Sequence, residues 1–322
     1  MSAKQMVLLV CTMMVLVLGG FACSQLCGHA HPYKWQPWAV VDISAADLSP
    51  QRLGESFVLT DSRVTLQTLN GIPTNAESVF LVSCRWRADA GILDGILSRC
   101  GMSLRYLSME GSNPSLRDMA KVKEFRQLET LMLPSVGVTA MELAAIGQVP
   151  TLREVNLDDA EVATLQLVQW LATNCIERCS LRGLHLQRHQ IDPSRPWLAR
   201  LKVIRFDVDD SIRPLDWLKH AKNVEDLEVS GVNEDDIVFI SRLASLKVLR
   251  LPKCDITAKM LTEIWKMNAV ERLDLSGTGI RDEDLKGFET MKGLKAINLN
   301  GCKVTFEGVS NLERIMKSKI TK

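Results

Sequence analysis

The sequence predicts an α/β solenoid, in which short parallel strands form one wall of a stack and short helices form the other. One apolar pattern occurs three times near the C-terminus, 24 residues apart, starting at Leu246, Val270 and Leu294. Each copy first alternates apolar and polar residues, as a strand with one buried face does. Each copy then places two apolar residues three apart, as the buried stripe of a helix does.

The pattern has apolar residues at positions 1, 4, 6, 11, 16 and 19 of each repeat, and it continues upstream. It begins again at Val224, Leu201, Leu181, Leu152, Leu128, Leu104 and, weakly, Val79. The longest interval is 29 residues, from Leu152 to Leu181, and predicts an extra loop at residues 174–180. One repeat cannot bury its own apolar face, so neighbours must stack into a continuous core, and we expect about ten strands.

The segment Leu275–Leu285 and its equivalents resemble leucine-rich repeats of the cysteine-containing and ribonuclease-inhibitor-like type, as in large bacterial repeat families. The resemblance covers residues 79–312 and implies a curved parallel sheet inside with helices outside. It also implies Asn, Cys or Thr at position 9, with its polar group against the turn of the neighbouring coil. Cys254, Thr278 and Cys302 follow this rule, whereas Ser112 and most upstream equivalents depart from it.

Residues 1–30 have the character of an export segment. Lys4 precedes an apolar run at residues 6–22, which ends in small residues before Cys23. The alternatives are a cleaved signal peptide, with or without lipid modification of Cys23, an uncleaved membrane anchor, or an apolar start without a targeting role. We therefore expect an exported, membrane-anchored or cell-envelope protein, with a secreted protein as the alternative.

The two ends of the repeat region carry no repeat. Residues 31–78 are expected to be a linker and an N-terminal cap, with Trp35, Trp38 and the run 40–43 folding over the open first coil. The tryptophans could instead be anchors at a membrane surface. Residues 313–322 form a basic tail, which is expected to be a solvated terminus.

Charge and motifs exclude several classes of function. The chain has 39 Lys and Arg residues against 38 Asp and Glu residues, and nucleic-acid binding needs a concentrated basic stripe instead. No nucleophile elbow, zinc-protease motif or phosphate-binding loop occurs. We expect no catalytic activity and no cofactor. The acidic turn with Asp207, Asp209 and Asp210 is expected to be solvated.

The cysteines and histidines near residue 180 suggest two further possibilities. Cys175, Cys179, His185 and His189 have ligand types that zinc prefers, but the repeat places the two histidines on different walls, so no metal site is expected. A disulfide between Cys175 and Cys179 is possible in an exported chain. Cys84, Cys254 and Cys302 are expected to point into the coil.

Strand position 5 faces the concave wall, and its residues in successive repeats define a candidate surface. They are Ser108, Met132, Asn156, His185, Arg205, Glu228, Arg250, Asp274 and Asn298. The four from Arg205 to Asp274 alternate in sign, which predicts either a self-neutralising ladder or a set of spaced charges for a partner.

The first half of the same wall is less charged. We hypothesise that Tyr106, Met132, Asn156 and His185 form the centre of a patch that binds a protein partner, flanked by Arg205, Glu228, Arg250 and Asp274. The helical residues Trp170, Trp217 and Trp265 are expected to fill the core. The function predicted is protein binding by the concave face, and the alternative is a structural spacer of the cell envelope without a dedicated ligand.

Overall fold

The computed structural model describes residues 40–42, 56–147, 149–192 and 196–320, and the side chains of 40–42 and 317–320 fall outside that description. The chain divides into two units, residues 1–36 and 37–322, and every described residue belongs to the second. The expected export segment, with Cys23, therefore lies outside the described residues. Within the described ranges, no helix is both long enough and apolar enough to span a membrane.

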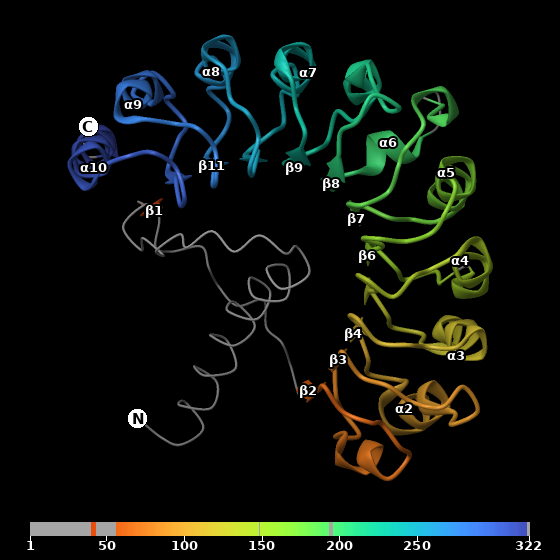
Figure 1. Ribbon diagram of the computed structural model, residues 1–322. Helices are drawn as coiled ribbons and strands as arrows, with labels where there is room; N and C mark the ends of the chain where they lie inside the picture. The colour runs from red at the N-terminus through yellow and green to blue at the C-terminus, as the bar shows by residue number, and fades with distance from the viewer. Residues whose placement is uncertain (1–39, 43–55, 148, 193–195, 321–322) are drawn as a thin grey trace, which may run out of the picture. The chain divides into compact units, whose positions relative to one another are not determined.

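Eleven parallel strands form the inner wall of the described stack, each paired with the next along the chain (Figure 1). This confirms the predicted solenoid. The strands are β2 (Ser56–Thr60), β3 (Ser78–Val82), β4 (Tyr106–Ser108), β5 (Thr130–Met132), β6 (Glu154–Asn156), β7 (Arg178–Leu181), β8 (Val203–Asp207), β9 (Asp226–Ser230), β10 (Val248–Arg250), β11 (Arg272–Asp274) and β12 (Ala296–Asn298).

Strand pairing fixes the register of the repeats and corrects the predicted one at two places. Cys179 pairs with Val155 and Ile204, so that repeat starts at Ile176 and not at Leu181. The predicted extra loop at residues 174–180 is therefore wrong, because β7 occupies its second half. The repeat placed weakly at Val79 starts at Ala76, and the longest spacing is the 28 residues from Ala76 to Leu104.

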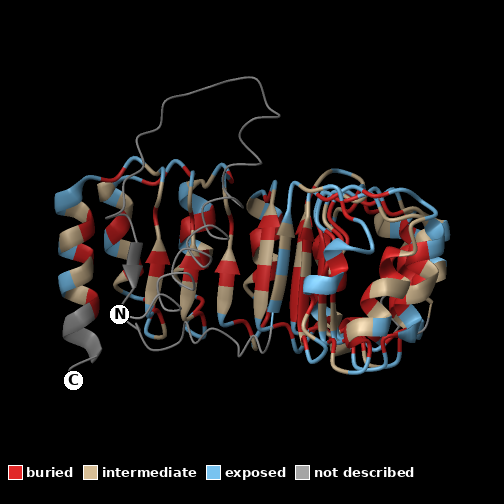
Figure 2. Cartoon of the chain, turned by 90° about the horizontal axis from the view of Figure 1, so that it is seen from below, coloured by how far each residue is buried: buried red, intermediate tan, exposed pale blue. Residues whose placement is uncertain are grey.

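The outer wall consists of short helices that bury one stripe each (Figure 2). The α-helices are α2 (Ile92–Cys100), α3 (Leu116–Lys121), α4 (Ala140–Ile146), α5 (Thr164–Thr173), α6 (Trp197–Arg200), α7 (Glu234–Ile240), α8 (Ala258–Ile264), α9 (Leu285–Phe288) and α10 (Phe306–Ile320). Shorter 3-10 turns supplement them: η2 (Thr68–Gly71), η3 (Val122–Glu124), η4 (Arg188–Gln190), η5 (Leu215–His220) and η6 (Asp282–Asp284). Trp170 and Trp217 are buried and Trp265 packs against the core, as predicted.

A left-handed residue at position 8 turns the chain away from nearly every strand. Ten position-8 residues from Asp61 to Gly301 have a positive φ, among them Ser135 (55°), Gly231 (70°) and Gly277 (69°), and Val208 after β8 is the exception. At Gly231 an added Cβ would lie 2.4 Å from the Val208 carbonyl oxygen, so only glycine fits there. At other coils a polar residue such as Asp159 tolerates this conformation. The same turn in nearly every coil places the following residues along one rim of the stack.

The two ends of the sheet differ from the prediction for residues 31–78. Strand β2 (56–60) is already part of the parallel sheet, so the stack begins upstream of residue 79. Strand β1 (Val40–Asp42) pairs antiparallel with β12, so the prediction that the run 40–43 covers the first coil is wrong. The last parallel strand would otherwise expose a full edge of unpaired backbone groups. Trp35 and Trp38 lie outside the described residues.

Candidate functional site

The register of the sheet defines a row of position-5 side chains along the concave wall. In order, the row contains Val58, Phe80, Ser108, Met132, Asn156, Ser180, Arg205, Glu228, Arg250, Asp274 and Asn298. The structure therefore places Met132, Asn156, Arg205, Glu228, Arg250 and Asp274 where the sequence predicted them. Tyr106 lies on the same face, at position 3 of its repeat and at the start of β4.

His185 is the exception, and its predicted place in the concave row is wrong. Because the repeat starts at Ile176, Ser180 occupies position 5 and His185 lies in the loop after β7. Its side chain is 87% exposed, and Nδ1 is 3.0 Å from the Asp209 carboxylate. Hydrogen bonds from Ser211 and then His185 lower the pKa of Asp209 to about 2. The pair belongs to the rim and not to a concave patch.

An apolar surface covers the N-terminal part of the concave wall. We call it the concave apolar patch, and it consists of Val58, Phe80, Val82, Tyr106, Met132 and Pro134. The Phe80 and Tyr106 rings are 4.8 Å apart between centroids, and Val58 remains 51% exposed. Burial, with smaller contributions from Glu154 and Glu110, raises the pKa of Tyr106 to about 12. Val58, Phe80 and Val82 were not among the predicted residues, because their coils lack the leucine pattern.

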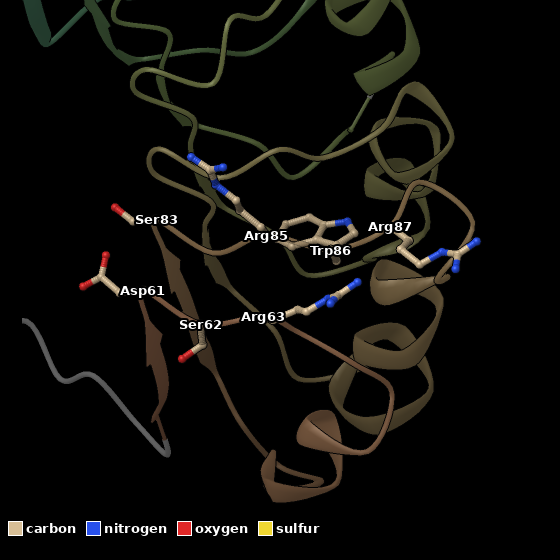
Figure 3. Close-up of a pocket in the computed structure, with 7 residues that line it drawn as sticks. All are labelled: Asp61, Ser62, Arg63, Ser83, Arg85, Trp86 and Arg87. Atoms are coloured by element: carbon tan, nitrogen blue, oxygen red, sulfur yellow. The ribbon is translucent and has the colours of Figure 1, made fainter.

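A groove of about 540 Å³ lies on the adjoining rim, where the chain leaves β2 and β3 (Figure 3). We call it the rim groove. It is lined by Asp61, Ser62, Arg63, Ser83, Arg85, Trp86 and Arg87. Trp86 is buried, whereas the three arginine side chains are exposed. The first three of these residues lie in the segment expected to be a cap, and the other four lie in the weakly predicted first repeat, so the apolar pattern singled out none of them.

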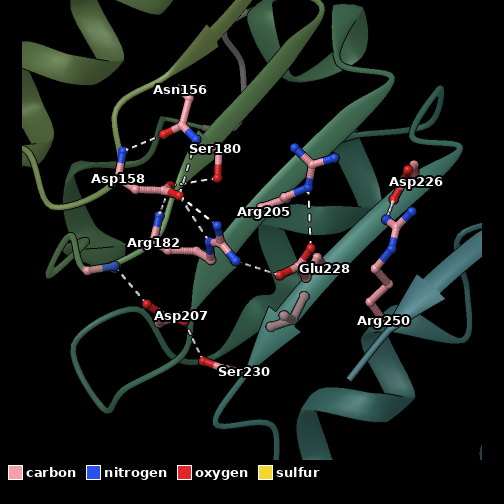
Figure 4. A network of polar contacts seen from close by, with 12 residues as sticks. Asn156, Asp158, Ser180, Arg182, Arg205, Asp207, Asp226, Glu228, Ser230 and Arg250 are labelled. Carbon is pink, nitrogen blue, oxygen red and sulfur yellow. Dashed lines mark hydrogen bonds and ion pairs between the residues drawn. The ribbon is translucent and has the colours of Figure 1, made fainter. Parts of the chain in front are cut away.

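The middle of the concave wall carries a connected polar network (Figure 4). The Asp158 carboxylate is 7% exposed and accepts hydrogen bonds from Ser180 Oγ (2.6 Å) and the Arg182 guanidinium (2.9 Å). Arg182 also contacts Glu228 at 2.9 Å, and Glu228 contacts Arg205 at 3.3 Å. Two arginines and two carboxylates from four successive coils thus neutralise one another, and both carboxylates are largely buried.

The predicted charge ladder from Arg205 to Asp274 forms only in part. Arg205 pairs with Glu228, but Arg250 pairs with Asp226 on the diagonal and not with either neighbour in its row. Asp274 accepts hydrogen bonds from Asn298 Nδ2 (3.0 Å) and the Ser276 backbone N–H (2.8 Å). Long side chains reach diagonal neighbours on the adjacent strand. The prediction compared only position-5 residues with one another, so it did not include this pairing.

Asn156 has a structural role that the prediction did not include. Its Oδ1 accepts a hydrogen bond from the Asp158 backbone N–H at 2.8 Å, and its Nδ2 lies 3.3 Å from the Asp158 carboxylate. Asn298 accepts from the Asn300 backbone N–H at 3.0 Å in the same way. The amide therefore shapes the end of its own strand, so it is less free to bind a partner than the apolar side chains beside it.

A strictly alternating charge ladder exists at position 2 instead, on the rim where the strands begin. Its members are Glu77, Arg105, Glu129, Arg153, Glu177, Lys202, Glu225, Lys247, Glu271 and Lys295. Each backbone N–H donates to the carbonyl of the preceding member, at 2.7 to 2.9 Å. Four ion pairs join neighbours, including Lys202–Glu177 (2.7 Å) and Lys295–Glu271 (2.8 Å). The alternation of charge is present in the sequence, but position 2 is not one of the apolar positions that defined the repeat, so it was not predicted.

The cysteines and histidines near β7 do not converge. Cys179 is a buried strand residue and Cys175 is exposed, and both thiols are free, so the possible disulfide between them does not form. Burial raises the pKa of Cys179 to about 12. The described part of the chain has no group of three or more His, Cys, Asp or Glu side chains placed to hold a metal ion.

The repeat pattern, the parallel strands and the concave rows together define a leucine-rich-repeat solenoid. No protein-family model matches the chain, and no curated protein matches it. Among solved structures it is similar to an internalin (inlF) from Listeria monocytogenes, with 12% identity over 80% of this chain and 84% of that one, at a TM-score of 0.44. It is also similar to TLR13 in a complex with ssRNA13, with 18% identity over 79% of this chain and 36% of that one, at a TM-score of 0.49. The class rests on the chain's own repeats.

Proposed function

We propose that this chain is a non-catalytic module that binds a protein partner through its concave wall. The observation that supports this most is the concave apolar patch. A rigid sheet holds its side chains in register, and Val58 and its half-buried neighbours remain open to solvent among the described residues. Apolar and aromatic side chains on a preformed surface are typical anchors of protein interfaces.

The centre of the proposed binding site is the concave apolar patch, which overlaps only in part with the four residues predicted from the sequence. Tyr106 and Met132 stay within it, and Phe80 and Val58 extend it toward the first strand. Asn156 borders it, and Arg205, Glu228, Arg250 and Asp274 form a flanking charged surface that sets orientation and salt dependence. His185 is removed because it lies on the rim.

A capture experiment tests the binding role. The full-length protein is immobilised and exposed to native cell extract, beside a variant carrying Val58→Arg and Met132→Arg. The matched control carries Met141→Arg and Leu165→Arg, which replace exposed apolar residues on the outer-wall helices α4 and α5. A protein retained by wild type and control but lost from the concave variant is the expected result, with all three forms melting alike.

Two outcomes contradict this placement. Equal retention by all three forms favours the alternative function, a structural spacer whose concave wall has no dedicated ligand. Equal loss from both variants shows that added charge anywhere removes the interaction, and the concave wall is then not its site.

We also propose that the protein is exported and held near a membrane by residues 1–30. The support is the apolar run at residues 6–22 after Lys4, followed by Cys23. Cell fractionation of wild type, Cys23→Ser and a form lacking residues 1–30 tests this proposal. The intact mass of the mature protein separates a cleaved signal, an uncleaved anchor and a lipid-modified Cys23, and recovery of wild type only in the soluble cytosolic fraction contradicts all three.

A further inference from the structure

Two arginines lie side by side in the rim groove. The backbones of Arg63 and Arg85 form a parallel bridge between the first two described coils. Arg85 N–H donates to the Ser62 carbonyl at 3.0 Å, and Val64 N–H donates to the Arg85 carbonyl at 2.9 Å. Neighbouring parallel backbones are about 4.8 Å apart, so two guanidinium groups are anchored within one side-chain length of each other.

The pair is not neutralised by the described part of the chain. Neither Arg63 nor Arg85 forms an ion pair or a side-chain hydrogen bond with any described residue. Like charges on adjacent strands destabilise a sheet. Elsewhere this chain avoids that cost, by alternating signs along position 2 and by pairing Arg182, Arg205 and Arg250 with carboxylates. Arg281 and Lys303 form a second bridged basic pair, but there Glu283 lies 3.8 Å from Arg281, whereas neither Arg63 nor Arg85 pairs with a described carboxylate.

The base of the groove is fixed, whereas its charged groups can move. Trp86 Nε1 donates to the buried Asp118 carboxylate at 3.0 Å, and Trp86 N–H donates to Asn113 Oδ1 at 3.1 Å. Arg63 and Arg85 extend in different directions in Figure 3, and exposed side chains of this kind rotate freely on a fast timescale. They can therefore converge on a shared ligand above a rigid base.

The balance of charge in the groove favours an anion. Three arginines line it against one carboxylate, that of Asp61, and Arg87 contacts Asp89 at 3.2 Å outside it. The Ser83 side chain lies at the same edge and carries a hydroxyl donor. Guanidinium groups bind phosphate and carboxylate through two parallel hydrogen bonds, which combine charge with shape.

We propose that the rim groove binds an oxyanion, a carboxylate or phosphate group, with Arg63 and Arg85 as its ligands. This proposal rests on the proposed function. The protein partner that covers the concave apolar patch would carry an acidic or phosphorylated group beside its contact segment. Val82 belongs to that patch and Ser83 lines the groove, so the two surfaces are continuous along the chain.

Calorimetric titration of the full-length protein tests the proposal. The probes are inorganic phosphate, a hexaglutamate peptide and a neutral peptide of equal length that carries one phosphoserine. The test variant carries Arg63→Gln and Arg85→Gln. The matched control carries Arg281→Gln and Lys303→Gln, a second bridged basic pair that has Glu283 3.8 Å from Arg281.

The expected result is binding of at least one probe by wild type and control, with affinity lowered about tenfold or more in the test variant. Binding should weaken as NaCl concentration rises. The probe that binds tells whether the group is a carboxylate or a phosphate. Absence of binding to all probes, or equal weakening in the test and control variants, overturns the proposal. The Val58→Arg and Met132→Arg variant should bind these probes like wild type, so failure of the groove and failure of the concave interface are distinguishable.

Discussion

At the scale of single residues, a donor at position 9 joins four of the coils to the coil before. The Cys84, Cys254 and Cys302 thiols lie 3.3, 3.7 and 3.0 Å from the position-6 carbonyl oxygen of the preceding coil. Ser112, which departs from the expected residue types, makes the same contact, from Oγ to the Leu81 carbonyl at 2.9 Å. Both a hydroxyl and a thiol can donate to this carbonyl, the thiol more weakly, so a donor at position 9 matters more than the residue type.

Ser112→Ala should lower the free energy of unfolding by about 1–3 kcal/mol, because it leaves the buried Cys84 N–H and Leu81 carbonyl without their partner. Ser98→Ala is the control, since that hydroxyl is exposed and bonds only within its own helix. Urea unfolding followed by circular dichroism measures both. Equal stability of Ser112→Ala and Ser98→Ala would show that the buried contact is dispensable.

Thiol reactivity should separate Cys175 from the buried cysteines. Cys175 is exposed, whereas burial raises the pKa of Cys100 to about 11 and that of Cys179 to about 12. A raised pKa keeps these thiols protonated and unreactive at neutral and mildly alkaline pH. Brief maleimide treatment followed by peptide mapping should find label on Cys175 and little on Cys179 or Cys254. Comparable labelling of Cys179 in the folded protein would place it at the surface.

At the scale of elements, the charge ladder recurs at position 2 of successive coils, and its neighbouring members pair with one another. Each ion pair is exposed, so each stabilises the protein by only about 0–1 kcal/mol. The ladder is more important for register. A stack that skipped one coil would place two like charges side by side at that junction, which opposes mispaired stacks.

Glu225→Lys should destabilise the protein by about 0.5–1 kcal/mol at low ionic strength, because it places a third positive charge between Lys202 and Lys247. The effect should shrink at high NaCl concentration, where exposed charges are screened. Asp255→Lys is the control, an exposed charge reversal outside the ladder. Melting temperatures at two salt concentrations provide the measurement, and a salt-independent loss would mean that the ladder charges do not interact.

At the scale of the whole molecule, a stack of repeats is stable only if its two ends are covered. At the C-terminal end, α10 lies against the last coil and buries Val309, Leu312 and Met316. Terminal repeats of solenoids need a polar outer face for solubility, and the exposed residues of α10 supply one.

Deletion of residues 306–322 should therefore expose the last coil and make the protein aggregate or melt at a much lower temperature. Deletion of residues 318–322 is the control, because it removes none of the described buried side chains. Light scattering during thermal denaturation measures both forms. A soluble protein with an unchanged melting temperature after the longer deletion would show that α10 does not act as a cap.

Sequence by itself determined the solenoid and most of its register, because apolar periodicity follows directly from the need to bury one face of each strand and helix. It also placed Met132, Arg205 and Glu228 on the concave wall. It failed near Leu181, where the leucines at 181, 184 and 186 fit the pattern in two registers, and only pairing with β6 and β8 selects one.

Only the tertiary structure decided the candidate sites. The concave apolar patch draws Phe80 and Val58 from coils whose sequences lack the leucine pattern, and they join it because strand pairing aligns them with Met132. Arg63 and Arg85 are 22 residues apart and become neighbours through one backbone bridge. Side-chain pairs such as Arg250 with Asp226 depend on the diagonal geometry of the sheet. A repeat fixes which wall a side chain faces, but contacts between coils select its partner.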